Sequence, residues 1–215
     1  MLIIQLLFSV MRPRTLFITA IVVFLIIAAT IIYKNLSTST SQTAVSSALP
    51  IPSWAISFGN PNAPLVLVEL FDLHCPYCAI AHEKLDPLYR RLMLEGKLRL
   101  IFVDFIVHPD AVVAHRYLHC AYKQLGNKTY DLLTQLYTTY LNEGPEKQLE
   151  LLRQYQCSNA PTQNDFEDVK RAMVNFLIQK GLVQIGTPTF IIVRNGSIDI
   201  VVGADVNRVS SLLSQ

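Results

Sequence analysis

The sequence predicts an α/β domain preceded by one N-terminal transmembrane helix. Residues 15–33 are almost wholly apolar and carry no charge. Residues 65–107 follow the order strand, helix, strand, which is typical of a parallel β-α-β unit. A largely helical stretch over about 108–183 then precedes two short strands and a final helix. With 215 residues, the chain is long enough for one domain with a sizeable core.

The N-terminal segment, residues 1–34, is expected to be a membrane anchor. As a helix, the apolar run would be roughly 28 Å long, close to the thickness of a bilayer's hydrocarbon core. Arg12 and Arg14 precede the run and only Lys34 follows it closely, so the rest of the chain should lie outside the cytoplasm. A cleaved signal peptide is the alternative, but the nearest small-residue cleavage pattern, at 46–48, lies well past the run.

Residues 35–52 are expected to form a solvated linker, because they are rich in Ser and Thr and show no hydrophobic periodicity. Beyond the anchor, 15 Lys and Arg face 16 Asp and Glu. This near-neutral balance argues against nucleic acid as a partner. Four cysteines in an exported domain agree with an oxidising compartment.

The domain proper is expected over 53–215. Residues 65–73 are apolar apart from Glu69 and Asp72, as in a strand that is buried on both faces. An Asn195-Gly196 pair between two short apolar runs predicts a β-hairpin. The other expected elements are an edge strand over 54–58, a strand over 97–107, hairpin strands over 189–193 and 198–202, and helices over 79–94, 110–125, 129–141, 146–156, 165–180 and 206–213.

The most informative motif is Cys75-Pro76-Tyr77-Cys78, which lies between the strand over 65–73 and the helix that follows. Two residues between two cysteines, at the first turn of a helix, allow the sulfur atoms to form a disulfide with little backbone movement. The positive end of the helix dipole also stabilises the thiolate of the first cysteine. The motif therefore predicts thiol–disulfide redox chemistry.

The same motif has other interpretations. Haem attachment is excluded because Ala79, not His, follows the second cysteine. A zinc site would need further ligands, and Cys120 and Cys157 are far apart in the sequence without ligand-type spacing. His74 and His82 flank the motif at positions that could assist a metal, so a metal-binding module stays open as a minor alternative.

The combination of motifs resembles the DsbA-type thiol–disulfide oxidoreductases, which have a thioredoxin-like fold with an inserted helical domain. The resemblance covers about 53–213. It depends on Phe71-Asp72-Leu73-His74 before the cysteine motif, on Gly186-Thr187-Pro188-Thr189-Phe190 before the hairpin, and on the helical insertion between them. It implies a protein thiol:disulfide oxidoreductase that needs no cofactor.

The resemblance also implies roles for particular residues. Cys75, expected to be the more exposed thiol, would be the nucleophile, and Cys78 would resolve the mixed disulfide. Pro188 would follow a cis peptide bond, and the backbone of Thr187 would pair with the client chain. Glu69 would exchange a proton with the buried cysteine, although a solvated position at a strand end is the alternative.

Four more residues have weaker expectations. His74 would stabilise the Cys75 thiolate, unless it is an ordinary loop residue. Cys120 and Cys157 would form a structural disulfide within the insertion, as in similar relatives; two free thiols or a second redox site are the alternatives. The histidines of the insertion, His108, His115 and His119, are expected to be ordinary surface or partly buried residues.

The leading functional hypothesis is a membrane-anchored enzyme outside the cytoplasm that donates its Cys75–Cys78 disulfide to exported client proteins. Its expected redox partner in the membrane is a DsbB/VKOR-like oxidase or a CcdA/DsbD-like reductant. A disulfide isomerase or reductase of the DsbC/DsbG kind is the alternative, since it shares the Cys-Pro-Tyr-Cys motif and a Thr before the proline. The sequence does not decide the direction of electron flow.

Overall fold

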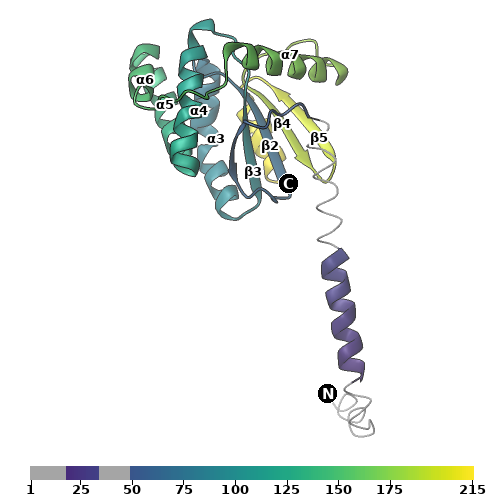
Figure 1. The fold of residues 1–215 in the computed structure, drawn as a ribbon. Helices are drawn as coiled ribbons and strands as arrows, with labels where there is room; N and C mark the ends of the chain where they lie inside the picture. The colour runs from purple at the N-terminus through teal and green to yellow at the C-terminus, as the bar shows by residue number, and fades with distance from the viewer. Residues whose placement is uncertain (1–17, 34–48) are drawn as a thin grey trace. The chain divides into compact units, whose positions relative to one another are not determined.

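The computed structural model describes residues 18–33 and 49–215. The chain divides into two units, 1–41 and 42–215. In the first unit, residues 18–33 form a helix (Figure 1). Its large apolar side chains are exposed.

Among the residues that are described, no helix has both the length and the apolar character needed to cross a membrane. The expected transmembrane segment over 15–33 is therefore not confirmed. Its first three residues lie outside the described part of the chain, as do residues 35–48 of the expected linker. Leu49 is buried and Ile51 packs beside it on the second unit, so the last residues of that expected linker belong to the packed domain.

Within residues 49–215, five strands form one mixed sheet in the order β1-β3-β2-β4-β5. β2 and β3 are parallel, and the other neighbouring pairs are antiparallel. Asn195 and Gly196, both with positive φ, form the tight turn of the β4–β5 hairpin. The strands are β1 (Ile56–Gly59), β2 (Leu65–Phe71), β3 (Leu98–Asp104), β4 (Thr189–Arg194) and β5 (Ser197–Val202).

The expected β-α-β unit, helical insertion and β-β-α unit are all present in this order (Figure 1). The helix expected over 146–156 ends earlier, at Leu152. The helix that opens at residue 163 has a capping box, in which the side chains of Thr162 and Asp165 each accept from the other's backbone N–H. The helices are α3 (Pro76–Leu94), α4 (Val112–Leu125), α5 (Thr129–Glu143), α6 (Pro145–Leu152), α7 (Gln163–Gln179) and α8 (Val206–Leu213).

Each face of the sheet is covered by a different set of helices. Alternate residues of β2, including Leu67 and Phe71, pack with α3, α8 and the first three helices of the insertion. The other residues of β2, Val68 and Leu70, pack with α7 on the opposite face. Glu69 shares the face of Leu67 and Phe71, so the strand directs its carboxylate toward the α3 side of the sheet.

Candidate active site

The cysteine motif lies at the junction between β2 and α3. Cys75 is the N-cap residue of α3, and Pro76 occupies the first helical position, where no backbone N–H is needed. Both cysteines are free thiols in this structure. The N-terminal end of the helix therefore surrounds the first sulfur with backbone N–H groups, as the motif predicts.

Cys75 is the more exposed of the two thiols, as expected, although it too is buried. Only 3% of its surface is accessible, against 0% for Cys78. The segment before β4 approaches Cys75 closely, because the thiol donates a hydrogen bond to the carbonyl oxygen of Thr187, with Sγ and O 3.3 Å apart.

The pKa values of the two thiols are shifted in opposite directions. Hydrogen bonding from the Cys78 thiol, together with the backbone N–H groups of Cys78 and Tyr77, lowers the pKa of Cys75 to about 6, although burial opposes this. Burial raises the pKa of Cys78 well above its ordinary value, and the negative charges of Cys75 and Glu69 add to the effect. Near neutral pH, Cys75 is mostly thiolate and Cys78 is a thiol.

Glu69 is fully buried beneath this pair. Its two carboxyl oxygens have no hydrogen-bond partner among the described residues. Burial, and secondarily the Cys75 thiolate, raises the pKa of this carboxyl to about 8. The alternative of a solvated strand end is therefore wrong, and Glu69 is protonated near neutral pH.

His74 is also buried, and its surroundings hold it in place. Its Nδ1 lies 2.8 Å from Oδ2 of Asp110, and its ring stacks on that of Tyr140 with centroids 5.6 Å apart. The carboxylate of Asp72 accepts hydrogen bonds from the backbone N–H groups of His74, Val107 and His108.

The loop expected to face the cysteines does so. The Thr187–Pro188 peptide bond is cis. Pro188 is buried and Thr187 is partly exposed. Because the Thr187 carbonyl contacts Cys75 directly, a chain that reached the sulfur would also meet this backbone.

The insertion contains a disulfide between Cys120 of α4 and Cys157, which follows α6. Two histidines of the insertion differ from their expected surface character. His115 and His119 are buried, and both contact the carboxylate of Asp104, at 2.6 and 2.9 Å. Sequence reasoning missed this buried acidic partner at the end of β3. His108 is partly exposed, as expected, and contacts Asp72.

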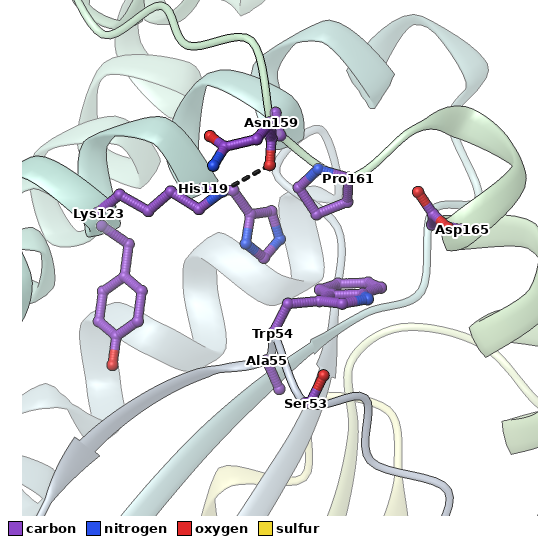
Figure 2. Close-up of a pocket in the computed structure, with 10 residues that line it drawn as sticks. Ser53, Trp54, Ala55, His119, Lys123, Asn159, Pro161 and Asp165 are labelled. Carbon is purple, nitrogen blue, oxygen red and sulfur yellow. Dashed lines mark hydrogen bonds between the residues drawn. The ribbon is translucent and has the colours of Figure 1, made fainter.

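In the described part of the chain, no group of three or more His, Cys, Asp or Glu side chains is arranged to hold a metal ion. A cavity of about 450 Å³ does exist in the domain, but neither Cys75 nor Cys78 lines it. Figure 2 shows Trp54, His119 and Lys123 around this cavity, with Lys123 donating to the backbone oxygen of Asn159. The cavity is therefore separate from the cysteine motif.

The arrangement has the components of thiol–disulfide exchange. A thiol with a lowered pKa can attack or leave as thiolate near neutral pH. Its neighbour is a buried thiol with a raised pKa, and a protonated carboxyl lies below the pair. The cysteines, Glu69 and the Thr187–Pro188 loop come from β2, α3 and the start of β4, so the fold brings together residues up to 119 positions apart.

Comparison with known proteins identifies relatives of the domain. A protein-family model described as Thioredoxin matches residues 54–198. Comparison with curated proteins returns no match.

Solved structures share the fold at low sequence identity. A periplasmic thioredoxin-like protein from Salmonella enterica serovar Typhimurium has a TM-score of 0.55 at 16% identity, covering 80% of this chain and 94% of its own. The thiol-disulfide exchange protein alpha-DsbA2 from Wolbachia pipientis has a TM-score of 0.53 at 18% identity, covering 85% and 97%. A thioredoxin-like oxidoreductase from Silicibacter pomeroyi DSS-3 has a TM-score of 0.54 at 22% identity, covering 78% and 94%.

Proposed function

The chain belongs to the thioredoxin family, and from this premise we propose that it is a protein thiol:disulfide oxidoreductase that donates a Cys75–Cys78 disulfide to exported client proteins. The observation that carries the proposal is the asymmetry of the two thiols. The pKa of Cys75 is lowered to about 6, whereas the pKa of Cys78 is raised. Such a pair reacts through one defined sulfur.

In the proposed reaction, a client thiolate attacks Sγ of Cys75 in the oxidised enzyme. The Cys75–Cys78 bond breaks, a mixed disulfide forms, and the electron pair leaves on Cys78, which takes a proton from Glu69. A second client thiolate then attacks the client sulfur of the mixed disulfide, and Cys75 leaves as thiolate. The client gains one disulfide and the enzyme pair is reduced by two electrons.

The lowered pKa of Cys75 favours this direction. At pH 7, a pKa of about 6 stabilises the reduced pair by about 1.4 kcal/mol relative to an ordinary thiol. For a two-electron couple this corresponds to a reduction potential about 30 mV higher. The effect makes the disulfide a better oxidant, since the reduced product is the form that gains stability.

The Thr187–Pro188 loop is the proposed docking element for the client chain. An extended client segment would pair with the backbone of Thr187 as a short β-strand addition, which places its sulfur close to Cys75. The supporting contact is the one between the Thr187 carbonyl and Sγ of Cys75. His74 is proposed to stabilise the thiolate from the adjacent position.

We further propose that the N-terminal segment attaches the domain to a membrane and that the domain lies outside the cytoplasm. The support is the charge-free apolar run over 15–33 with Arg12 and Arg14 before it. In that location a DsbB/VKOR-like oxidase would return the pair to the disulfide. A CcdA/DsbD-like protein would instead keep it reduced.

One observation favours a second candidate, a reductase or isomerase of the DsbC/DsbG kind. The pKa of about 6 at Cys75 is closer to thioredoxin's value of about 7 than to DsbA's value of about 3.5. The reduction potential distinguishes the two. A value near −270 mV would indicate a reductase, and a value near −120 mV an oxidase.

Trapping of mixed disulfides tests the proposed function. In its native host, a Cys78→Ala variant lacks the thiol that would attack the mixed disulfide at Cys75 and release the captured protein, so client proteins and the redox partner should remain covalently bound to Cys75. The matched control is Cys75→Ser, which should capture nothing because it lacks the sulfur that forms the mixed disulfide. Equal capture by both variants would contradict the proposal.

A further inference from the structure

Three residues, Asp72, Leu73 and His74, connect the end of β2 to Cys75, and the last two of them lie directly before the reactive residue. The β2 ladder ends before them, because its last paired residues are Leu70 with β4 and Phe71 with β3. The backbone groups of Leu73 and His74 therefore have no strand partner. Leu73 is fully buried and His74 nearly so, so leaving these groups unbonded would be costly.

Side chains satisfy all four of these backbone groups. The N–H of Leu73 donates to Nε2 of His115 over 3.0 Å, and its carbonyl oxygen accepts from Nε2 of Gln148 over 3.1 Å. The N–H of His74 donates to Asp72 over 2.8 Å, and its carbonyl oxygen accepts from the hydroxyl of Tyr140 over 2.6 Å.

Three of the four partners come from the helical insertion, and each comes from a different helix. His115 belongs to α4, Tyr140 to α5 and Gln148 to α6. We call these three residues the backbone clamp. They lie 42, 66 and 75 residues from the groups that they bind, so their convergence requires the first three helices of the insertion to pack together.

The clamp residues are themselves held in place. The second N–H of the Gln148 amide donates to the carbonyl oxygen of Leu136 over 3.1 Å. His115 contacts Oδ1 of Asp104 through Nδ1, and Asp104 also contacts His119 beside the cavity in Figure 2.

The protonation state of His115 follows from these contacts. Burial lowers the pKa of His115, whereas the carboxylates of Asp104 and Asp72 raise it, so the hydrogen bonds decide which form this structure contains. A proton on Nε2 would nevertheless oppose the N–H of Leu73. We therefore assign a neutral imidazole that donates from Nδ1 to Asp104 and accepts at Nε2.

We propose that His115, Tyr140 and Gln148 are positioning residues that fix the peptide segment before Cys75 and thereby orient its sulfur toward the N–H groups at the start of α3. The proposal rests on the proposed function for its biological meaning. What it states about the molecule is only how the position of Cys75 is fixed. In this proposal the insertion has a role in the site, because its helices bind the backbone of the two residues that precede Cys75.

The mechanism is the fixed direction of Cys75. Its sulfur receives stabilising hydrogen bonds from Cys78 and Tyr77 and contacts Thr187 on the other side. Movement of the 73–74 peptides would change those distances, since Cys75 follows directly in the chain. Loss of a clamp bond should therefore weaken stabilisation of the thiolate.

Tyr140→Phe tests this with little disturbance, because it removes the hydroxyl but keeps the ring that stacks on His74. Tyr122→Phe is its matched control. Tyr122 also lies in the insertion, and its hydroxyl donates to a backbone carbonyl, that of Ser57 in β1, over 2.8 Å. Gln148→Met, which removes the amide, is paired with Gln154→Met, whose amide bonds only a local carbonyl.

The readout is the thiolate absorbance of the reduced full-length chain as a function of pH, together with the free energy of unfolding. Cys78 does not interfere, because its pKa lies well above that of Cys75. The variants do not change the residues that act on the Cys75 sulfur or on Cys78, which are Glu69, Asp72, Tyr77, Cys78 and Thr187.

Tyr140→Phe and Gln148→Met are expected to decrease the acid dissociation constant of Cys75 about three- to tenfold, a rise in its pKa of about 0.5 to 1. The two controls should leave it unchanged, although Tyr122→Phe should lower stability. An unchanged Cys75 pKa in Tyr140→Phe, or an equal shift in Tyr122→Phe, would overturn the proposal. If Gln148→Met does not fold, the tyrosine pair decides alone.

This experiment does not require disulfide exchange. If the wild-type chain exchanged no disulfides, the proposed function would fail while the Cys75 titration still tested the clamp. If exchange occurred but the clamp variants titrated like the wild type, only the clamp would fail.

Discussion

Glu69→Gln should make the reduced protein more stable at neutral pH. Glu69 is fully buried without a hydrogen-bond partner among the described residues, and its pKa in the folded protein is about 8, against an ordinary value of 4.5. As pH rises from 4.5 to 8, the unfolded chain loses this proton first. The folded state then carries the cost of retaining it, so stability falls over this window.

The size of the effect follows from the two pKa values. Between pH 4.5 and pH 7, Glu69 should cost the folded state about 3 kcal/mol. Gln has nearly the shape of the protonated carboxyl and does not titrate. The difference in unfolding free energy between the variant and the wild type should therefore grow by about 3 kcal/mol over this interval.

Denaturant titrations at several pH values would measure this difference, with the fluorescence of Trp54, the one tryptophan of the chain, as the probe. Cys75 titrates in the same range, but it is present in both proteins, so comparison at each pH largely removes its contribution. Glu83→Gln, on the exposed side of α3, is the control and should show no growing difference. A difference that stays constant from pH 4.5 to 7 would show that the pKa of Glu69 is not raised in the folded protein.

Two other predictions concern the cysteines. The rate at which Cys75 is alkylated by iodoacetamide should rise with a midpoint near pH 6, while Cys78 should stay unreactive through pH 8; mass spectrometry of the modified peptides would check both, and a midpoint near 9 for Cys75 would contradict its lowered pKa. Replacing Cys120 and Cys157 together by Ser should lower the free energy of unfolding by about 4 kcal/mol, because the bond closes a loop between positions 37 residues apart; denaturant titration would show it, and a loss below about 1 kcal/mol would contradict this role.

Local patterns in the sequence were sufficient to predict most of the fold. Continuous apolar runs marked β2 and β3, and the Asn195-Gly196 turn marked the β4–β5 hairpin, because each depends on neighbouring residues. The end of α6 was less predictable. Residues 153–156 continue a helix-compatible composition, but the helix stops at Leu152.

The candidate site also has parts that local sequence patterns predict and parts that depend on tertiary packing. The cysteine motif and the Gly186–Phe190 segment carry recognisable local patterns, so both were found from the sequence. The side chain of Gln148 has no such signal, because a buried glutamine can be identified only once α6 is seen against Leu73. His115 and Asp104 were missed for the same reason: their pairing depends on how α4 packs on β3.

The most direct test of the account is a single-turnover reaction between the oxidised full-length chain and a reduced client protein that has two thiols. The client should gain one disulfide for each Cys75–Cys78 disulfide lost, and Cys75→Ser should abolish the transfer. A client that stayed reduced while the Cys75–Cys78 disulfide persisted, or equal transfer by Cys75→Ser, would contradict the proposed function.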